Sequence, residues 1–164
     1  MILVLLTFTL VCVFHGNLVF SNSNDELTNV AYSKSVRLSS FASRWHNGFY
    51  AVNGMFSDFI HTLVEKSPWL RIDLGARYQI HEIEVFARSD CCGYQLHEVD
   101  FRVGMKIHKM HLCGHFTGHA STGQRIVVFC PSNTTGRYVQ LQIVAGYSNY
   151  LTPAEVLVWG KHVY

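Results

Sequence analysis

The chain lacks the sequence signatures of the main enzyme classes. It has no G-x-S-x-G nucleophile turn, no H-E-x-x-H zinc motif and no glycine-rich phosphate loop. No pair of carboxylates stands at a spacing that points to acid–base catalysis. The sequence therefore predicts a protein that is not an enzyme.

The chain also lacks a cluster of basic residues. Its 13 Lys and Arg residues and 11 Asp and Glu residues give a formal net charge of +2, and the cations are dispersed along the chain. Nucleic-acid binding and attachment to anionic lipid both need concentrated positive charge. We therefore expect no nucleic-acid partner.

The first residues are almost wholly apolar and carry no charge. This run covers residues 2–14, and Val19-x-Ser21 offers a small residue for cleavage. The pattern is typical of a secretory signal, although no Lys or Arg precedes the run. An uncleaved anchor is the alternative, because the uncharged stretch continues to Phe20 and approaches membrane-spanning length. A polar His-Gly-Asn segment interrupts that stretch, so we predict a signal peptide over residues 1–21.

Cleavage would leave residues 22–164 as one domain, which is large enough to bury a hydrophobic core. The segment Asn133-Thr134-Thr135 is an acceptor for N-glycosylation and fits an extracellular location. We expect a secreted glycoprotein with no membrane insertion after cleavage.

Four cysteines remain in the mature chain, namely Cys91, Cys92, Cys113 and Cys130. An even number in an oxidising compartment predicts two disulfides, with three possible connectivities. Adjacent cysteines can pair only in a strained ring, because Cα atoms across a trans peptide lie about 3.8 Å apart and the usual disulfide range begins at about 4.4 Å. The alternative is that Cys91 and Cys92 pair with two distant cysteines. The residues alone leave both possibilities open.

Apolar and polar residues alternate with a period of two at several places in the mature chain, which is typical of strands. The apolar positions of the expected strands are Leu70-Ile72-Leu74, Ile83-Val85-Ala87, Val99-Phe101-Val103, Val139-Leu141-Ile143 and the run Val156 to Trp159. Glycine-containing turn signals separate them, and no long helical periodicity is present. The sequence predicts an all-β fold, a β-sandwich of the jelly-roll type.

The run Arg88-Ser89-Asp90-Cys91-Cys92-Gly93 follows one of these expected strands. Arg88 and Asp90 would lie on the same side of the chain, where the carboxylate can hold the guanidinium by two hydrogen bonds. His61 lies in a loop, and a neutral imidazole can donate to or accept from a hydroxyl. A disulfide ring beside a fixed cation would suit the apolar face and hydroxyl edge of a sugar. The alternative is an ordinary surface ion pair and a loop histidine.

Two kinds of metal site can be considered. Four histidines surround Cys113 and suggest zinc, namely His108, His111, His115 and His119. Cys113 has a possible disulfide partner in Cys130, however, and we expect loop histidines that face solvent. Side-chain oxygens of Asn53, Asp58 and Glu155 could contribute to a calcium site.

The chain resembles the F-type lectins, or fucolectins, a family of secreted proteins that bind L-fucose. The family motif is a histidine, 26 residues and then Arg-x-Asp-Cys-Cys-Gly, and here residues 62–87 separate His61 from Arg88. Other segments also resemble the family. They are Asn29-Val30-Ala31, Pro68 to Leu74, Phe129-Cys130-Pro131, Gly136 to Val139 and Ala154-Glu155-Val156.

The resemblance implies a galactose-binding-domain-like sandwich over residues 22–164 and a function in recognising fucosylated glycans or glycoproteins, with a role in innate defence. By that resemblance, a Cys91–Cys92 disulfide would stack on the fucose ring and Cys113–Cys130 would be the second bridge. His61 and Arg88 would bind the region of the axial hydroxyl, with Asp90 orienting Arg88.

The resemblance further implies a structural calcium ion. Its matching positions here are Asn53, Asp58, the carbonyl of Ala154 and Glu155. Homo-oligomers would give such a lectin useful avidity, because linked weak sites gain by effective concentration.

The chain departs from the family at Gln95, where the motif has a second basic residue. A neutral hydrogen bond in place of a charge-assisted one costs about 1 kcal/mol, or roughly five- to tenfold in affinity. Residues 55–60 form a shorter segment than in the family, and Phe59 and Ala154 replace cysteines of some relatives. These departures motivate an alternative function, a degenerate lectin domain that acts as an extracellular protein-interaction module.

Overall fold

The computed structural model of the chain describes residues 26–163. The predicted signal peptide lies outside the described residues, so its cleavage stays a prediction. Within residues 26–163, no helix is long and apolar enough to cross a membrane.

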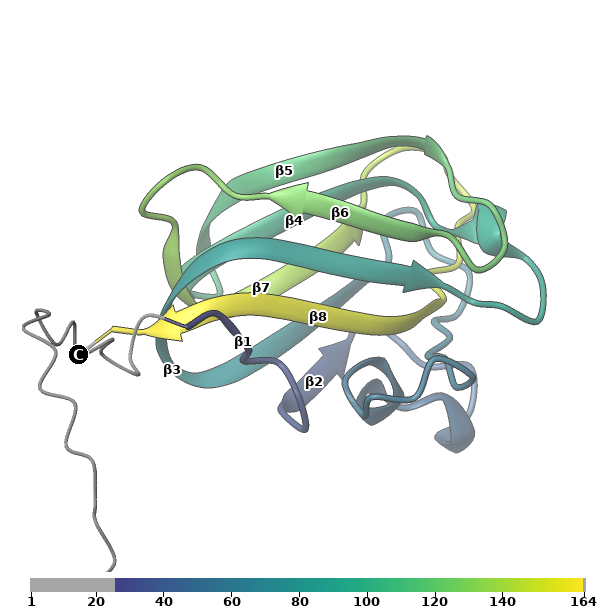
Figure 1. Cartoon of the computed structure of the whole chain (residues 1–164). Helices are drawn as coiled ribbons and strands as arrows, with labels where there is room; N and C mark the ends of the chain where they lie inside the picture. Colours follow the sequence, from purple (N-terminus) through teal and green to yellow (C-terminus); the bar gives the residue numbers. More distant parts are fainter. Residues whose placement is uncertain (1–25, 164) are drawn as a thin grey trace, which may run out of the picture.

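The regular secondary structure of the described chain consists mainly of antiparallel strands (Figure 1). They are β1 (Thr28–Asn29), β2 (Ser35–Leu38), β3 (Trp69–Ala87), β4 (His97–Lys106), β5 (Lys109–His119), β6 (Arg125–Phe129), β7 (Thr135–Ile143) and β8 (Pro153–His162). Short 3-10 helices occur at η1 (Arg44–His46), η2 (Gly48–Ala51) and η3 (Gly93–Gln95). The predicted all-β fold is confirmed.

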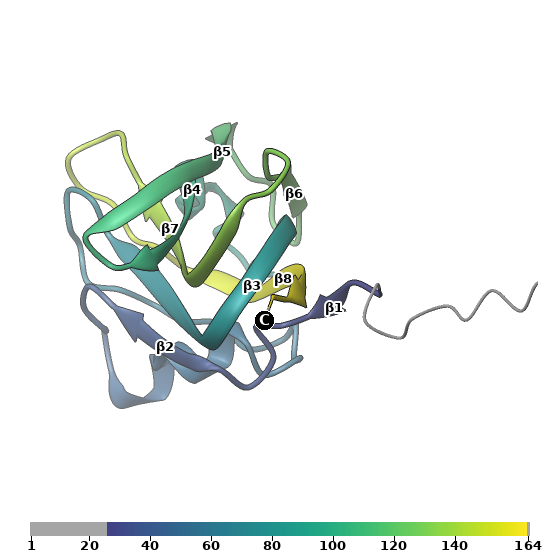
Figure 2. The same cartoon turned by 90° about the vertical axis from the view of Figure 1, so that its left-hand side faces the viewer.

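The long strand β3 belongs to two layers, because it bends near its middle (Figure 2). Residues 69–73 pair with β2 and β7, and residues 78–87 pair with β8 and β6. The pairing with β7 shifts register between Asp73 and Tyr78, where Gly75 adopts a φ of +84°. We expected a turn between two strands here, whereas the glycine allows a single strand to bend.

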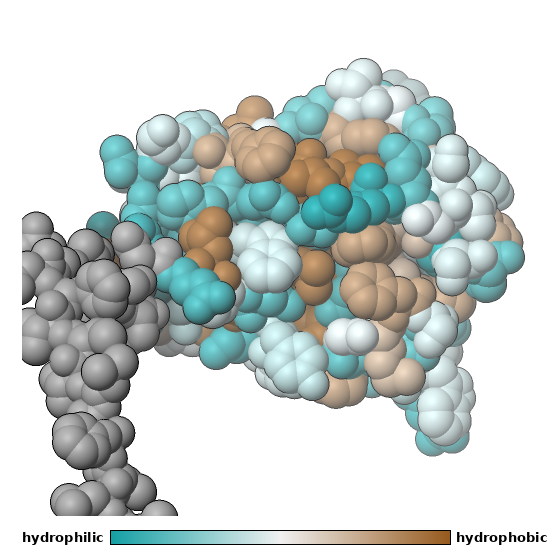
Figure 3. All heavy atoms as spheres, viewed as in Figure 1, coloured by the Kyte–Doolittle hydropathy of each residue, from teal (hydrophilic) through white to brown (hydrophobic). Residues whose placement is uncertain are grey.

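The two layers are β2, the first half of β3, β7, β4 and β5 on one side, and β1, β8, the second half of β3 and β6 on the other. We call the first of these the arginine layer, after Arg37, Arg71, Arg102 and Arg137 on its strands. The alternating apolar residues face inward, and Leu70, Ile83 and Phe101 are fully buried. On the other layer, apolar side chains lie in separate patches among hydrophilic ones over β3, β6 and β8 (Figure 3).

The prediction that the histidines around Cys113 lie in a loop is wrong for three of them, because this segment forms strand β5. His111, His115 and His119 lie on β5, where their exposed side chains alternate with more buried neighbours. The sequence pattern did not indicate this strand, because the histidines are polar and the segment contains Gly114 and Gly118. Cys113 of β5 is joined to Cys130, which follows β6, so this disulfide links the two layers at their open side.

The loops divide between two ends of the sandwich (Figure 1). We call the end where β3 stops and β8 begins the loop end, because the loops 39–68, 88–96, 120–124 and 144–152 gather there. The bend of β3, the β4–β5 hairpin and the exposed turn that carries Asn133 lie at the opposite end. A glycan on Asn133 would therefore leave the loop end free.

Candidate functional site

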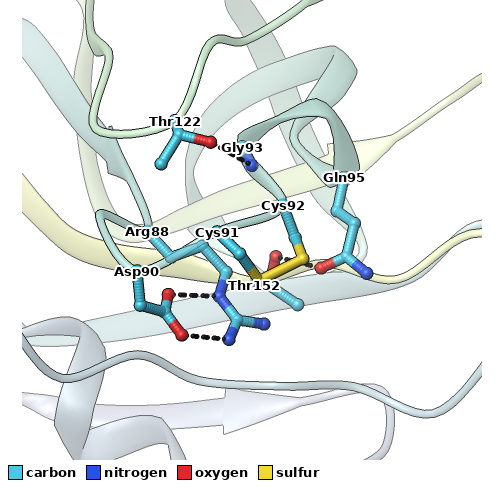
Figure 4. Close-up of a disulfide and its surroundings, with 8 residues drawn as sticks. All are labelled: Arg88, Asp90, Cys91, Cys92, Gly93, Gln95, Thr122 and Thr152. Carbon is cyan, nitrogen blue, oxygen red and sulfur yellow. Dashed lines mark hydrogen bonds and ion pairs between the residues drawn. A yellow bond between two sulfur atoms is a disulfide. The ribbon is translucent and has the colours of Figure 1, made fainter.

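A disulfide between the adjacent residues Cys91 and Cys92 lies at the loop end, and their Cα atoms are 3.8 Å apart. Cys92 has a left-handed backbone with a φ of 59° and precedes the short helix η3. Gly93 follows, and its amide donates a 3.3 Å hydrogen bond to the Thr122 hydroxyl (Figure 4). A Cβ atom on Gly93 would overlap the backbone of Ser121 and Thr122. The glycine of the motif is thus needed to seat the ring against the 121–122 loop.

Arg88 is held beside this ring by two hydrogen bonds to Asp90. Arg88 Nε donates to Asp90 Oδ1 at 2.8 Å and Arg88 Nη2 donates to Asp90 Oδ2 at 2.6 Å. The Arg88 side chain is 11% exposed and its Cζ lies 3.8 Å from the centre of the Phe59 ring. The hydrogen bonds from Arg88 lower the pKa of Asp90 to about 2. Because a guanidinium has five N–H donors, three remain for a ligand.

His61 reaches the same region from the loop that precedes β3. Its segment runs antiparallel to the chain before β8, since the Ile60 amide donates to the Pro153 carbonyl at 3.1 Å and the Thr62 amide donates to the Leu151 carbonyl at 3.2 Å. His61 Nδ1 lies 2.7 Å from the Thr62 carbonyl. A carbonyl only accepts, so Nδ1 carries the proton and a neutral His61 keeps Nε2 as an acceptor.

Aromatic contacts connect His61 with Arg88. The His46 ring stacks on Phe59 at 5.1 Å and lies 5.7 Å from His61, whose other neighbour is Tyr150 at 5.1 Å. Burial lowers the pKa of His46, and so do the charges of both His61 and Arg88. His46, Phe59 and Tyr150 were not predicted as site residues, because they come from loops without a pattern that marks them.

Gln95 lies on the other side of the disulfide from the Arg88 guanidinium (Figure 4). The buried Thr152 hydroxyl donates a 3.0 Å hydrogen bond to Gln95 Oε1. The side-chain oxygen of Gln95 is thereby occupied, and its amide nitrogen is the group left to donate. The site thus carries one cation and one neutral donor around the ring.

The residues expected to bind calcium come together at the same end of the sandwich, beside the start of β8. Asn53 Nδ2 donates to Asp58 Oδ2 at 3.0 Å, and the Gly54 amide donates to Glu155 Oε1 at 3.1 Å. Glu155 is fully buried and its Oε2 has no hydrogen-bond partner. Burial and the charge of Asp58 raise the pKa of Glu155 to about 7.

An orphaned buried carboxylate oxygen beside a second carboxylate fits a hard cation, which prefers such ligands. Buried Ala154 stands next to Glu155 at the start of β8. Within the described residues, no group of three or more His, Cys, Asp or Glu side chains gathers as a metal site. Calcium would therefore need amide and carbonyl oxygens as well as the two carboxylates.

Two histidines of β5, His115 and His119, are engaged in other contacts. His115 bonds to Asp100 at 2.8 Å and to Glu98 at 3.1 Å, and these carboxylates raise its pKa. His119 stacks on His97 at 4.7 Å. His115 and His119 thus each have partners on the surface of the sheet.

Comparison with known protein families identifies the family to which this chain belongs. The family model described as NedA-like, galactose-binding domain matches residues 50–141, which is more than half of the chain. The chain belongs to this family. Its members are binding modules without catalytic function, which confirms the prediction that the chain is not an enzyme.

Relatives of this galactose-binding domain include the fucolectin of Anguilla anguilla, which is 28% identical over 102 residues, or 60% of this chain and 64% of that protein. The F-lectin from the serum of Morone saxatilis superimposes with a TM-score of 0.76 at 26% identity, over 83% of this chain and 50% of that one. The lectin domain of lectinolysin, solved in complex with Lewis b antigen, gives 0.71 at 26% identity over 81% and 96%.

The chain thus spans less than two thirds of the length of the fucolectin and half of the F-lectin structure. The resemblance to F-type lectins and the β-sandwich fold are confirmed. The roles of individual site residues stay predictions.

Proposed function

We propose that this chain is a secreted, non-catalytic lectin that binds terminal L-fucose on glycans. The observation that carries the proposal is the arrangement of Arg88, held by Asp90, with His61 and the Cys91–Cys92 ring at the loop end. The likeness to a fucolectin and to a lectin domain solved with bound Lewis b antigen supports the choice of sugar.

The site offers a sugar complementary groups. A hydroxyl can donate to His61 Nε2 and accept from a free N–H of Arg88, so that both of its hydrogen-bonding functions are satisfied. The disulfide supplies a flat apolar surface for the face of the ring. Because Asp90 and Phe59 already hold Arg88, little side-chain entropy is lost when the sugar binds.

The neutral amide of Gln95 weakens this site relative to one with two cations. It donates a neutral hydrogen bond where the family motif has a charge, at a cost of about 1 kcal/mol. We therefore expect weak binding of free fucose and stronger binding to clustered glycans or by homo-oligomers.

We further propose that calcium binds between Asn53, Asp58, the Ala154 carbonyl and Glu155. The support is the unpartnered Glu155 Oε2 and the neighbouring Asp58 carboxylate. Bound calcium would supply positive charge that keeps Glu155 ionised. It would thereby fix the start of β8 near Thr152, which orients Gln95.

A glycan array tests the fucose proposal directly. We expect signals on fucosylated glycans that decrease when calcium is chelated and disappear in Arg88→Ala. Arg77→Ala is the matched control, because Arg77 is exposed near the bend of β3 and away from the loop end. A fucose signal that is unchanged in Arg88→Ala would contradict the assignment of the site.

Exposed aromatic residues favour a second candidate function, a protein-interaction module with a degenerate sugar site. Phe41, Trp45, Phe49 and Tyr147 are more than half exposed at the loop end, and such surfaces often mark interaction sites. Competition separates the two functions. If L-fucose fails to displace a protein partner from this end, the interaction module is the better description.

A further inference from the structure

The outer face of the arginine layer carries arginines from four neighbouring strands. Arg37 of β2 lies opposite Arg71 of β3, Arg71 lies opposite Gln140 of β7, and Gln140 lies opposite Arg102 of β4. Arg137 follows the start of β7 on the same layer. The register of the sheet therefore gathers cations that are dispersed in the sequence.

Two of these arginines have carboxylate partners and two do not. Arg137 donates to both oxygens of Asp73, at 2.7 and 2.8 Å, and Arg102 donates to Asp100 at 2.7 Å. No carboxylate within residues 26–163 forms an ion pair with Arg37 or Arg71. Arg37 and Arg71 thus form an uncompensated pair of cations.

Arg71 is nevertheless held in one orientation. Its Nε donates to Gln140 Oε1 at 2.9 Å, and its Cζ lies 4.3 Å from the centre of the Trp69 ring. Like charges opposite each other in a sheet are unfavourable. Burial and the charge of Arg37 both lower the pKa of Arg71. A bound anion would remove this repulsion.

A cavity of about 300 Å³ lies at these two guanidinium groups. It is lined by Ser35, Arg37, Arg71, Asp73, Ile107 and Tyr138. This volume is at the lower end of the range for small-molecule sites. The charge of Asp73 is balanced by Arg137, which donates to both of its oxygens, and together with the Gly75 amide these contacts lower the pKa of Asp73 and keep it ionised.

We propose that this cavity binds the sulfate group of an acidic glycan. Arginine side chains suit oxyanions, since their N–H groups match two oxygens at once. Tyr138 and Ile107 add apolar walls and Ser35 adds a hydroxyl, a combination suited to the ring of the sugar that bears the sulfate. The cavity lies on a sheet face and shares no residue with the fucose site, so it would bind a different part of a glycan or a second glycan.

Calorimetric titration with a heparin tetrasaccharide in about 50 mM salt tests this site, since low salt limits screening. We expect wild-type protein to bind it, and the double variant Arg37→Gln/Arg71→Gln to bind at least about tenfold more weakly. Arg44→Gln is the control, because it removes one positive charge from an exposed position on η1 at the loop end. Its affinity should stay unchanged.

Two further measurements make the result specific. The double variant should melt within a few degrees of wild type, because relief of the like-charge pair offsets the lost Arg71–Gln140 hydrogen bond and Trp69 contact, so weaker binding could not be attributed to unfolding. Saturating L-fucose should not displace the tetrasaccharide, which keeps this result independent of the fucose proposal.

Three outcomes would overturn the proposal. They are the absence of tetrasaccharide binding to wild type, equal weakening in Arg44→Gln, and equal binding of a desulfated tetrasaccharide. Vesicles containing phosphatidylserine serve as a further probe. If wild type binds the vesicles through Arg37 and Arg71 but not the tetrasaccharide, the ligand is a lipid phosphate and the assignment to a sugar is wrong.

Discussion

Arg88 and Glu155 are charged groups at the same end of the sandwich with opposite surroundings. Glu155 lies opposite Phe86 in the register of β3 and β8, two residues before Arg88. Arg88 has its counter-ion in Asp90, whereas one oxygen of the buried Glu155 has no partner. Asp90 thus balances the charge of Arg88 within the protein. The Glu155 carboxylate requires a bound proton or a bound cation. The Arg88 side of the proposed sugar site is therefore pre-organised, whereas the region around Glu155 depends on pH and on the cations in solution.

The largest expected effect concerns Glu155. Without calcium its pKa is about 7 in the folded protein, above the value of about 4.3 in an unfolded chain. The folded state then binds more protons between these values, so stability falls as the pH rises from about 4.5 to 7, by on the order of 3 kcal/mol. Chemical unfolding in the presence of a chelator at a series of pH values measures this slope.

The variant Glu155→Gln should lack this slope, and added calcium should restore the lost stability of wild type at pH 8, which raises its melting temperature. Glu26→Gln, which changes an exposed carboxylate, should behave as wild type. If the stability of wild type and of Glu155→Gln depended on pH in the same way, Glu155 would not be the uncompensated buried group that distinguishes it from Arg88.

The double variant Cys91→Ser/Cys92→Ser removes the apolar platform beside Arg88. If the ring buries on the order of 60 Å² of apolar surface against the sugar, affinity for fucose should fall by about 1.5 kcal/mol, or roughly tenfold. The fold should persist, because Cys113–Cys130 links the two layers independently. Titration with a fucosylated trisaccharide, together with circular dichroism, measures both. Unchanged affinity would remove the ring from the site.

Gln95→Lys restores a second cation on the other side of the ring. We expect affinity for fucose to increase by about 1 kcal/mol, or five- to tenfold, since a charge-assisted hydrogen bond replaces a neutral one. The same titration measures the change, and Ser89→Lys at an exposed position serves as a control for added charge near the ring. If Ser89→Lys gains as much as Gln95→Lys, general electrostatic attraction explains the increase.

Asp90→Asn should have the smallest effect. Asp90 is 54% exposed, so solvent screens the pair and its loss should cost less than about 1 kcal/mol of stability. Fucose affinity should fall a few-fold, because Arg88 then loses a charged partner that orients it. A loss as large as that in Arg88→Ala would mean that Asp90 itself binds the sugar.

The sequence predicted the core of the fold and the part of the site that lies within one short segment. Alternation at period two located the buried strands, and the spacing Arg88-x-Asp90 predicted the ion pair that the structure contains. Both are local patterns, for which the backbone geometry of a strand is sufficient.

The contacts that complete the site depend on tertiary packing. Phe59 under Arg88, His46 and Tyr150 beside His61, and Thr152 on Gln95 come from loops that no periodicity relates to the motif. The proximity of Arg37 and Arg71 likewise follows from the pairing register of β2 with β3. Net charge and local composition therefore could not indicate a cationic cavity.

Mapping amide and side-chain chemical shifts by NMR during a titration with L-fucose tests the central proposal most directly. We predict that the largest shifts occur at the Arg88 Nε–H, the His61 imidazole and the Gly93 amide, with a smaller shift at the Gln95 side-chain amide. The absence of shifts at these groups, or shifts confined to another face of the sandwich, would contradict the proposal that the Cys91–Cys92 ring and its neighbours bind fucose.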